Sequence, residues 1–274
     1  MNLGKPAIIP PLDPDFVPAS LWIRDFNSLV DQSGEGVPFR IALQQPNGAT
    51  VVKSGKLLPE THPQAELNHL RIERLLKFML WSCGGSRWFW DGPQEVGEFL
   101  DERFAGHPCG KFDSDFMAKV YQEPFCRQTG NEVPEPRGLA SPLGRNLEGC
   151  RIGFDLGGSD RKVAAVIDGE VTFSEETPWD PYHQTDPEYH KAGIMDSIEK
   201  AKAHLPRLDA IGGSSAGVFV DDRPRVASLF RGISDSDFTE IISPMFIDVG
   251  KELGVPLSII NDGEVTALAA SMSL

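Results

Sequence analysis

Five consecutive residues, Asp155-Leu156-Gly157-Gly158-Ser159, combine a carboxylate, a glycine pair and a hydroxyl between two apolar stretches. This pattern predicts a β-hairpin with glycines in its turn. Glycines at a strand end let backbone N–H groups face an anion, because no side chain stands in the way. Asp155 cannot contact a phosphate directly, since both are negative, but it can hold a hydrated Mg²⁺ that phosphates share. The alternative is a plain hairpin turn, where Asp, Gly and Ser are also common.

Two further apolar stretches end in polar residues. Residues 208–211 run into a glycine-rich loop that contains Ser214, Ser215 and Gly217, and residues 255–260 end at Asn261-Asp262-Gly263. A carboxylate such as Asp262, at the end of a buried strand, can accept a proton from a bound substrate. The amide of Asn261 can donate and accept a hydrogen bond at once. The alternative for Asn261-Asp262-Gly263 is a turn with left-handed residues.

The elements that must position these residues follow from periodicity and turn signals. Asp168-Gly169 predicts a second tight turn, into a strand at 170–173. Helices are predicted over 188–205 and 238–253, a short strand over 225–230, and a last helix from Glu264. The order of strands and helices predicts an α/β domain with a mixed sheet over residues 149–274.

Residues 1–148 form a separate α+β region in this interpretation, and its role is unknown. A proline-rich extended arm is predicted over 1–20, a hairpin around Pro46-Asn47-Gly48, and a helix from Thr61 to Met79. The aromatic stretch 87–90 is expected to be a strand that packs in the core rather than a surface that stacks on a base. The pattern weakens between Gly106 and Gly149, which places the domain boundary close to residue 148.

Composition excludes several classes of protein. The chain has 274 residues and a net charge of −14, which argues against nucleic acid as a partner because phosphates would be repelled. No apolar run is long enough to cross a bilayer, and residues 1–14 do not resemble a signal peptide. The four scattered cysteines form no Cys-X-X-Cys pair, so reduced thiols and a cytoplasmic location are expected. His183 and His190 are expected to be surface or loop histidines rather than metal ligands.

In their order along the chain, the three motifs resemble the first half of a sugar kinase of the ROK family (repressors, open reading frames, kinases), within the actin/hexokinase/Hsp70 superfamily. In that family an Asp-X-Gly-Gly-Thr hairpin is the first phosphate motif. A glycine-rich loop leading to a Val-Asp turn, here Val220-Asp221, lies by the substrate, and an Asn-Asp pair precedes an alanine-rich helix. The resemblance covers residues 150–274 and leaves residues 1–149 unexplained.

The resemblance implies an RNase H-like (actin-like ATPase) fold and an ATP-dependent kinase for a sugar or sugar-like substrate, with ATP and Mg²⁺ as cofactors. It implies that Asp262 is the catalytic base and that Asp155 holds Mg²⁺ through water. The residues expected to contact phosphate are Gly157, Gly158 and Ser159. The residues expected to contact the sugar are Asn261, Ser214, Ser215 and Gly217.

The chain departs from the family pattern after the alanine-rich helix. The second phosphate motif, the adenosine loop and a cysteine-rich zinc motif would follow that helix, so the chain is expected to be a truncated half. The last helix is then expected to expose Val265, Leu268, Ala269 and Met272, and a homodimer would cover them. A sugar-binding or regulatory ROK-like protein without catalysis, and an acetate-kinase-like or activator ATPase, remain alternatives. A repressor is disfavoured, because the N-terminal region does not resemble a helix-turn-helix.

Overall fold

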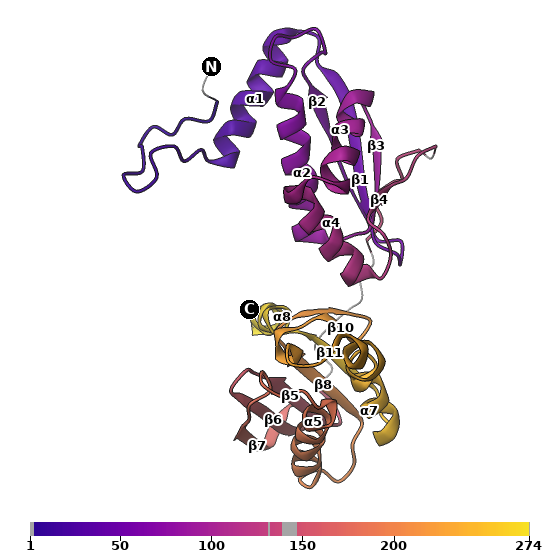
Figure 1. Cartoon of the computed structure of the whole chain (residues 1–274). Coiled ribbons are helices and arrows are strands. Elements are labelled where there is room, and N and C mark those ends of the chain that lie inside the picture. The colour runs from indigo at the N-terminus through magenta and orange to yellow at the C-terminus, as the bar shows by residue number, and fades with distance from the viewer. Residues whose placement is uncertain (1–2, 131, 139–146, 274) are drawn as a thin grey trace. The chain divides into compact units, whose positions relative to one another are not determined.

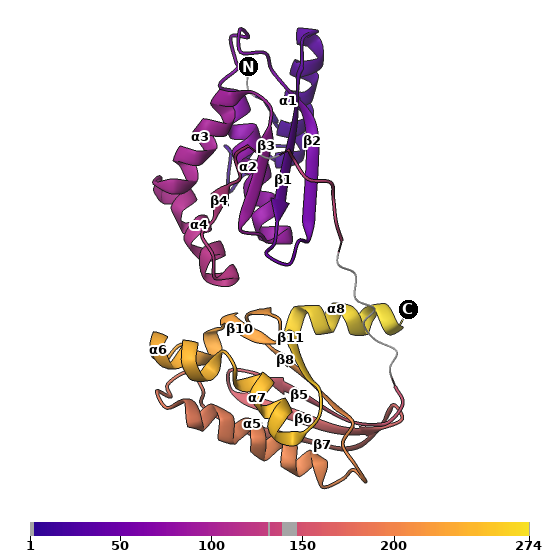
Figure 2. The same ribbon diagram turned by 90° about the vertical axis from the view of Figure 1, so that its right-hand side faces the viewer.

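The structure is a computed structural model that describes residues 3–130, 132–138 and 147–273. The chain forms two compact units, Met1–Ala140 and Ser141–Leu274. Figures 1 and 2 show the helices and strands of each unit.

The first unit contains a four-stranded sheet in the order β2-β1-β3-β4. Strand β1 is antiparallel to β2 and β3, and β3 is parallel to β4. The predicted hairpin around Pro46-Asn47-Gly48 is therefore confirmed. The elements are α1 (Ala19–Ser33), β1 (Val37–Gln44), β2 (Thr50–Leu57), α2 (Leu67–Cys83), β3 (Arg87–Asp91), α3 (Gln94–Ala105), α4 (Pro108–Tyr121) and β4 (Cys126–Arg127).

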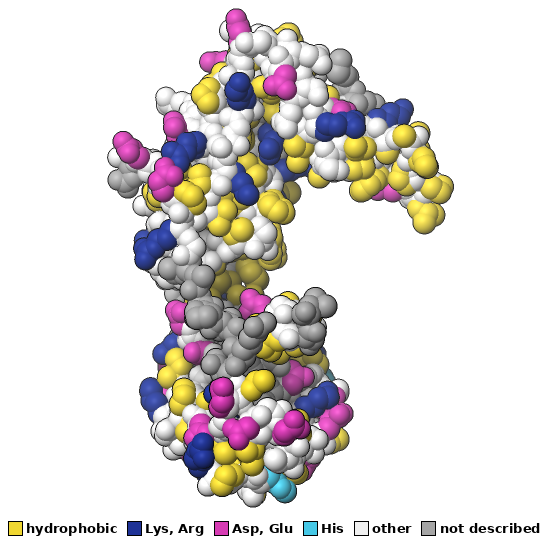
Figure 3. Space-filling model, turned by 180° about the vertical axis from the view of Figure 1, so that it is seen from behind, with side chains coloured by type: hydrophobic (Ala, Val, Ile, Leu, Met, Phe, Trp, Pro, Cys, Tyr) yellow, Lys and Arg dark blue, Asp and Glu magenta, His cyan; other side chains and the backbone are white. Residues whose placement is uncertain are grey.

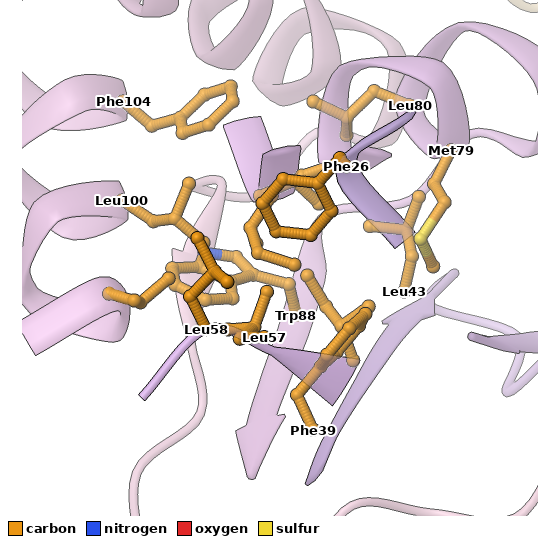
Figure 4. Packing of buried hydrophobic residues seen from close by; sticks show 14 of the residues in the cluster. Phe26, Phe39, Leu43, Leu57, Leu58, Met79, Leu80, Trp88, Leu100 and Phe104 are labelled. Carbon is orange, nitrogen blue, oxygen red and sulfur yellow. The ribbon is translucent and has the colours of Figure 1, made fainter. Parts of the chain in front are cut away.

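Aromatic and aliphatic side chains from the helices and from β1–β3 form the core of the first unit, as Figure 4 shows. Phe26 from α1 is fully buried, and Trp88 from β3 is 1% exposed. The aromatic strand therefore contributes to the core, as predicted. Burial of such side chains is the main stabilising contribution to a unit of this size.

Helix α4 was not predicted, because its residues lie where the sequence pattern weakens. His107 caps the helix by accepting a hydrogen bond from the amide of Cys109, and Pro108 occupies its first turn. Gly110 allows α4 to approach α3 closely, since a Cβ there would lie 2.1 Å from the carbonyl oxygen of Arg103. The local sequence signals for the start of α4 are thus the capping residue His107 and Pro108. Both residue types also occur in loops, so they do not by themselves predict a helix.

The second unit contains a five-stranded mixed sheet in the order β11-β8-β5-β6-β7, which confirms the predicted α/β class. Strands β5, β6 and β7 are antiparallel neighbours, whereas β5, β8 and β11 are parallel. The elements are β5 (Cys150–Leu156), β6 (Asp160–Ile167), β7 (Glu170–Pro178), α5 (Pro187–Lys202), β8 (Ala210–Ser215), β9 (Val218–Val220), β10 (Arg223–Val226), η1 (Ser228–Phe230), α6 (Asp235–Asp237), η2 (Phe238–Ile242), α7 (Met245–Leu253), β11 (Leu257–Asn261) and α8 (Asp262–Ser273).

The two faces of this sheet differ. Ile152 and Phe154 of β5 point to the face covered by α5 and α7, where they join the core with Phe246. Gly153 and Asp155 alternate onto the other face, on which α8 lies (Figure 2). The alternation follows from the two-residue period of a strand.

Two local predictions in this unit need correction. The stretch predicted as a strand over 225–230 is divided between β10 and the short helix η1. The predicted helix 238–253 is a π-helical turn followed by α7, and Pro244 separates them because it cannot donate a backbone hydrogen bond. The turn at Asp168-Gly169 is confirmed, with φ angles of 52° and 89°.

The N-terminal arm before α1 has no helix or strand over residues 5–18, but it is not extended as predicted, because backbone hydrogen bonds from Asp13 to Pro10 and from Phe16 to Asp13 form turns in it. Its hydrophobic side chains are visible on the right of Figure 3. Ile8 is 85% exposed and Leu12 is 99% exposed. No helix in the described part of the chain is both long and apolar enough to span a membrane.

Candidate functional site

The turn between β5 and β6 is held by hydrogen bonds that leave two amides without a partner among the described residues. Gly157 donates its amide to the carbonyl oxygen of Asp160 at 2.9 Å. Trp179 fixes the other side, since its indole donates to the carbonyl of Gly157 at 2.8 Å and its amide donates to that of Ser159 at 3.0 Å. The amides of Gly158 and Ser159 donate to no other residue that the structure describes. They can therefore donate to an anion.

The negative charge of the Asp160 carboxylate, beside this turn, is balanced by neighbouring side chains. The Lys162 ammonium lies 2.5 Å from Asp160 Oδ1, and the Ser159 hydroxyl donates to Asp160 Oδ2 at 3.0 Å. These contacts, that of Lys162 above all, lower the pKa of Asp160 below its usual value. The side chain of Ser159 is thus engaged with Asp160, and its amide is the group that remains for a phosphate.

Asp155 lies one residue before the end of β5, and the strands on either side place polar groups next to it. Its register partners are Lys162 on β6 and Ser214 on β8. The Ser214 hydroxyl donates to Asp155 Oδ1 at 2.5 Å. Since Oδ1 also has a second lone pair and Oδ2 accepts no hydrogen bond from a described side chain, the carboxylate can still hold a hydrated cation.

Asp155 and Ser214 line a hollow of about 730 Å³ on the α8 face of the sheet. Gly153 and Gly212, register partners on β5 and β8, lie at its floor. A Cβ at either glycine would meet no atom within 4 Å, so these residues leave the floor open. Helix α8 contributes Val265 and Leu268 to the lining. These two apolar residues of the last helix are half-buried, whereas they were expected to be exposed; the exposure predicted for Ala269 and Met272 is confirmed.

Asn261-Asp262-Gly263 is not a turn. Asn261 ends β11 and Asp262 begins α8, and none of the three residues has a positive φ angle. Asn261 caps the helix, because its Oδ1 accepts a hydrogen bond from the amide of Gly263 at 2.8 Å. Its Nδ2 donates to the carbonyl of Gly217 at 2.8 Å. The alternative of a left-handed turn is therefore wrong.

Asp262 is exposed at the N-terminus of α8, where the helix dipole favours a charged carboxylate. It forms no ion pair within the described part of the chain. The parallel register pairs Leu156 with Ser215 and Ser215 with Asn261, so β5, β8 and β11 end at one edge of the sheet. Asp155 lies one residue before this row and Asp262 one residue after it. The structure therefore brings the two predicted carboxylates to the same edge.

The predicted sugar-binding residues of β8 and its loop differ in their surroundings. Ser214 lines the hollow, whereas Ser215 is 1% exposed and donates to the carbonyl of Leu156 at 3.0 Å. Gly217 has φ of 145°, and a Cβ there would lie 2.8 Å from the carbonyl oxygen of Val226. Ser215 and Gly217 thus fix the strand and loop in place.

Tyr182 and Arg231, which lie over the hairpin turn, are not among the predicted site residues. Tyr182 covers Gly158 so closely that a Cβ on Gly158 would lie 2.0 Å from the phenol oxygen. The Arg231 guanidinium lies 3.8 Å from the centre of the Tyr182 ring. Residues 177–183 had been predicted only as a loop, and no local signal in the sequence connects Arg231 with Tyr182.

His183 and His190 were both predicted to lie at the surface or in a loop, and the structure contradicts this prediction for one of them. His183 is exposed and lies 2.8 Å from Asp180, as a surface histidine should. His190 is fully buried in α5, which contradicts the predicted surface or loop position. Its Nε2 lies 3.2 Å from the carbonyl of Pro181, and its Nδ1 has no hydrogen-bond partner in the described part of the chain. His190 therefore supports the loop that carries Tyr182.

Burial of His190 predicts a pH-dependent stability. Desolvation lowers the pKa of His190 in the folded state. The unfolded chain then binds the proton more readily, so stability is lost as the pH falls below about 6.5, by at most about 1.4 kcal/mol per pH unit. Urea denaturation at pH 7.5 and pH 5.5 should show this loss, and His190→Phe should reduce it. His183→Gln, at an exposed position, should leave the pH dependence unchanged; an equal effect of both variants would contradict the assignment.

Comparison with known proteins gives similarity in structure only. No family model matches the chain. No curated protein matches it.

Solved structures similar to this chain include ROK-family proteins. A ROK hexokinase from Thermus thermophilus is 19% identical over 42% of this chain, with a TM-score of 0.32. A putative N-acetylmannosamine kinase from Listeria monocytogenes is 19% identical over 42% of this chain, with a TM-score of 0.31. A ROK-family transcriptional regulator, a homologue of the E. coli MLC protein, is 20% identical over 46% of this chain, with a TM-score of 0.34.

The chain covers only about a third of each of these proteins, namely 34%, 35% and 31% of their lengths. Likeness at these identities and TM-scores is partial and says nothing about catalysis. What the comparisons show is a resemblance, over about two fifths of the chain, to ROK sugar kinases and to a ROK regulator.

Proposed function

We propose that the second unit is the first half of an RNase H-like kinase fold and that the full-length protein transfers a phosphoryl group from ATP to a hydroxyl of a sugar or sugar-like substrate. The observation that carries the proposal is the parallel register of β5, β8 and β11. It brings the hairpin turn, Asp155 and the Asn261-Asp262 pair to one edge of the sheet. Ligand sites of α/β sheets lie outside the carboxyl ends of parallel strands.

Asp262 acts as the general base in this proposal. The substrate hydroxyl oxygen forms a bond to the γ-phosphorus as the bond from that phosphorus to the β,γ-bridging oxygen breaks. The electron pair of the broken bond leaves with ADP, and the hydroxyl proton passes to the carboxylate of Asp262. Asp262 suits this role because it is exposed and has no ion-pair partner in the described residues.

The described residues fit a magnesium ion that is bound through water rather than by a cluster of protein ligands. In the described residues, no three His, Cys, Asp or Glu side chains are grouped to hold a metal ion. Asp155 would therefore hold Mg²⁺ through water, with phosphate oxygens as the remaining ligands. When bound, Mg²⁺ supplies neutralisation of charge on the phosphates. The amides of Gly158 and Ser159, which have no partner among the described residues, hold phosphate oxygens, and Gly157 shapes the turn.

Asn261 and Ser214 bind the sugar in this proposal. Asn261 uses one N–H for Gly217 and one lone pair for Gly263, which leaves one donor and one acceptor for a substrate hydroxyl. Ser214 faces the hollow. We assign Ser215 and Gly217 the positioning of this wall rather than direct contact with the sugar.

Both the nitrogen and the oxygen of the Asn261 side-chain amide form hydrogen bonds within the protein. This rigid arrangement also favours a second candidate function. A sugar-binding or regulatory protein without transfer needs only a rigid wall at the strand ends, and the cap of α8 supplies one. The two functions differ in one product: only the kinase converts a sugar and ATP into a sugar phosphate and ADP.

Phosphorus NMR of the protein with ATP, Mg²⁺ and a panel of aldohexoses and N-acetylhexosamines tests the proposal. A sugar phosphate is the expected product. Asp155→Asn should raise the KM for Mg²⁺–ATP by about 10–100-fold, the usual cost of losing a group that orients metal ligands. Asp248→Asn removes the same charge from an exposed ion pair on α7 and should change KM less than about twofold. Sugar binding without any sugar phosphate would favour the regulatory candidate.

A further inference from the structure

Arg231 lies where the segment after β10 meets the loop over the hairpin turn. This segment begins beside the sugar wall, because Gly217 packs against Val226 and Ala227. It continues through η1 to Arg231. The next residue, Gly232, is pressed against the loop, since a Cβ there would lie 2.4 Å from the carbonyl oxygen of Gln184. The backbone at Arg231 is therefore held between the loop at Gly217 and the loop that carries Tyr182.

The guanidinium of Arg231 is oriented by a neighbouring ring and has no anionic partner among the residues that the structure describes. It stacks on the Tyr182 ring at 3.8 Å, and the phenol end of that ring covers Gly158. Arg231 is exposed and forms no ion pair with a described residue. Stacking occupies the flat face of a guanidinium and leaves its five N–H donors, which lie at the edge, available to an anion.

The stacking by itself is also consistent with a purely structural role, in which Arg231 only holds Tyr182 in place. The position of the tyrosine indicates more, because the cation is one ring away from the amides of Gly158 and Ser159. Other cations near the turn are already paired: Lys162 with Asp160, and buried Arg161 with Asp196. A polyphosphate with two or three negative charges is repelled by a protein of net charge −14, and an unpaired cation at the site offsets this repulsion.

We propose that Arg231, held on the Tyr182 ring, binds the terminal phosphate of the phosphoryl donor. The ligand class is a magnesium-bound polyphosphate chain, such as that of a nucleoside triphosphate. This inference rests on the proposed function, since it adds a cation to the same phosphate site. Arg231 contacts the oxygens of the group that is transferred, where charge builds up during the reaction.

Titration calorimetry of the whole chain with magnesium tripolyphosphate tests the inference without a nucleoside or a sugar. Arg231→Ala should weaken binding by about 10–100-fold, the range for a hydrogen bond to a charged group. Arg231→Lys should restore part of the loss, because it keeps the charge without the planar fork. Arg207→Ala is the matched control, since Arg207 is an exposed arginine of the same unit paired with Asp209; it should change binding less than about twofold.

The outcomes separate the two proposals. If Arg231→Ala binds tripolyphosphate like the unchanged chain and tripolyphosphate still shifts the Gly158 amide resonance of this variant, the hairpin holds phosphate and Arg231 only supports Tyr182, so the inference is overturned. If the unchanged chain does not bind tripolyphosphate, the proposed function and this inference both fail. Circular dichroism checks that each variant is folded.

Discussion

Asp262→Asn is expected to lower kcat for sugar phosphorylation by about 10²–10⁴-fold, the usual contribution of a general base. An amide has the shape of the carboxylate but cannot take up the hydroxyl proton. Asp262 lies at the exposed start of α8, and its loss leaves the cap of that helix by Asn261 in place. Sugar affinity should therefore change by less than about threefold. Steady-state kinetics and calorimetry with the phosphorylated sugar measure the two quantities separately.

The control for this prediction is Asp248→Asn, which removes one exposed carboxylate from the same unit. It should keep kcat within about twofold. If Asp262→Asn retains full activity, Asp262 is only a helix-start residue. A parallel loss of sugar binding and kcat would assign it to substrate binding instead of proton transfer.

Phe246→Ala is expected to lower the free energy of unfolding of the second unit by about 3–5 kcal/mol. Phe246 of α7 is fully buried and stacks on Phe154 of β5, with ring centroids 6.2 Å apart. It also contacts Phe219 edge-on, with centroids 6.4 Å apart. Removing the ring leaves a cavity against the strand that carries Asp155. Urea denaturation followed by circular dichroism measures the loss.

Ile241→Ala provides the comparison, because Ile241 is 46% exposed in the neighbouring helical turn. Its effect should stay below about 1 kcal/mol. Hydrogen exchange should show the loss caused by Phe246→Ala in peptides of residues 150–215. A loss below about 1 kcal/mol for Phe246→Ala would mean that α7 does not anchor the sheet.

Local signals predicted the parts of the fold that depend on short stretches of sequence. The turns at Asn47-Gly48 and Asp168-Gly169 were confirmed because glycine and aspartate tolerate the positive φ angles found at Gly48, Asp168 and Gly169. Helix α4 was missed because its apolar face packs on α3 through Gly110, a contact that local periodicity does not show. His190 was placed at the surface because a histidine carries no sequence signal of burial; packing of α5 against the loop before it buries the ring.

The residues of the candidate site that lie at strand ends could be predicted from the sequence, whereas the residues that surround them could not. Asp155 and Asp262 could be found because each lies at the end of an apolar stretch, but only the register shows that the stretches end in one row. The hydrogen bond of Ser215 to Leu156 depends on that register too. Arg231 and Tyr182 meet through a tertiary contact between two loops, which no spacing along the chain indicates.

Amide NMR of the chain with magnesium tripolyphosphate and the accepted sugar tests the central claim most directly, namely that one sheet edge holds both substrates. The polyphosphate is expected to shift the amides of Gly157, Gly158 and Ser159 only when Mg²⁺ is present, and Asp155→Asn is expected to reduce these shifts. The sugar is expected to shift the side-chain amide of Asn261. Shifts confined to other parts of the chain, or hairpin shifts that need neither Mg²⁺ nor Asp155, would contradict the claim.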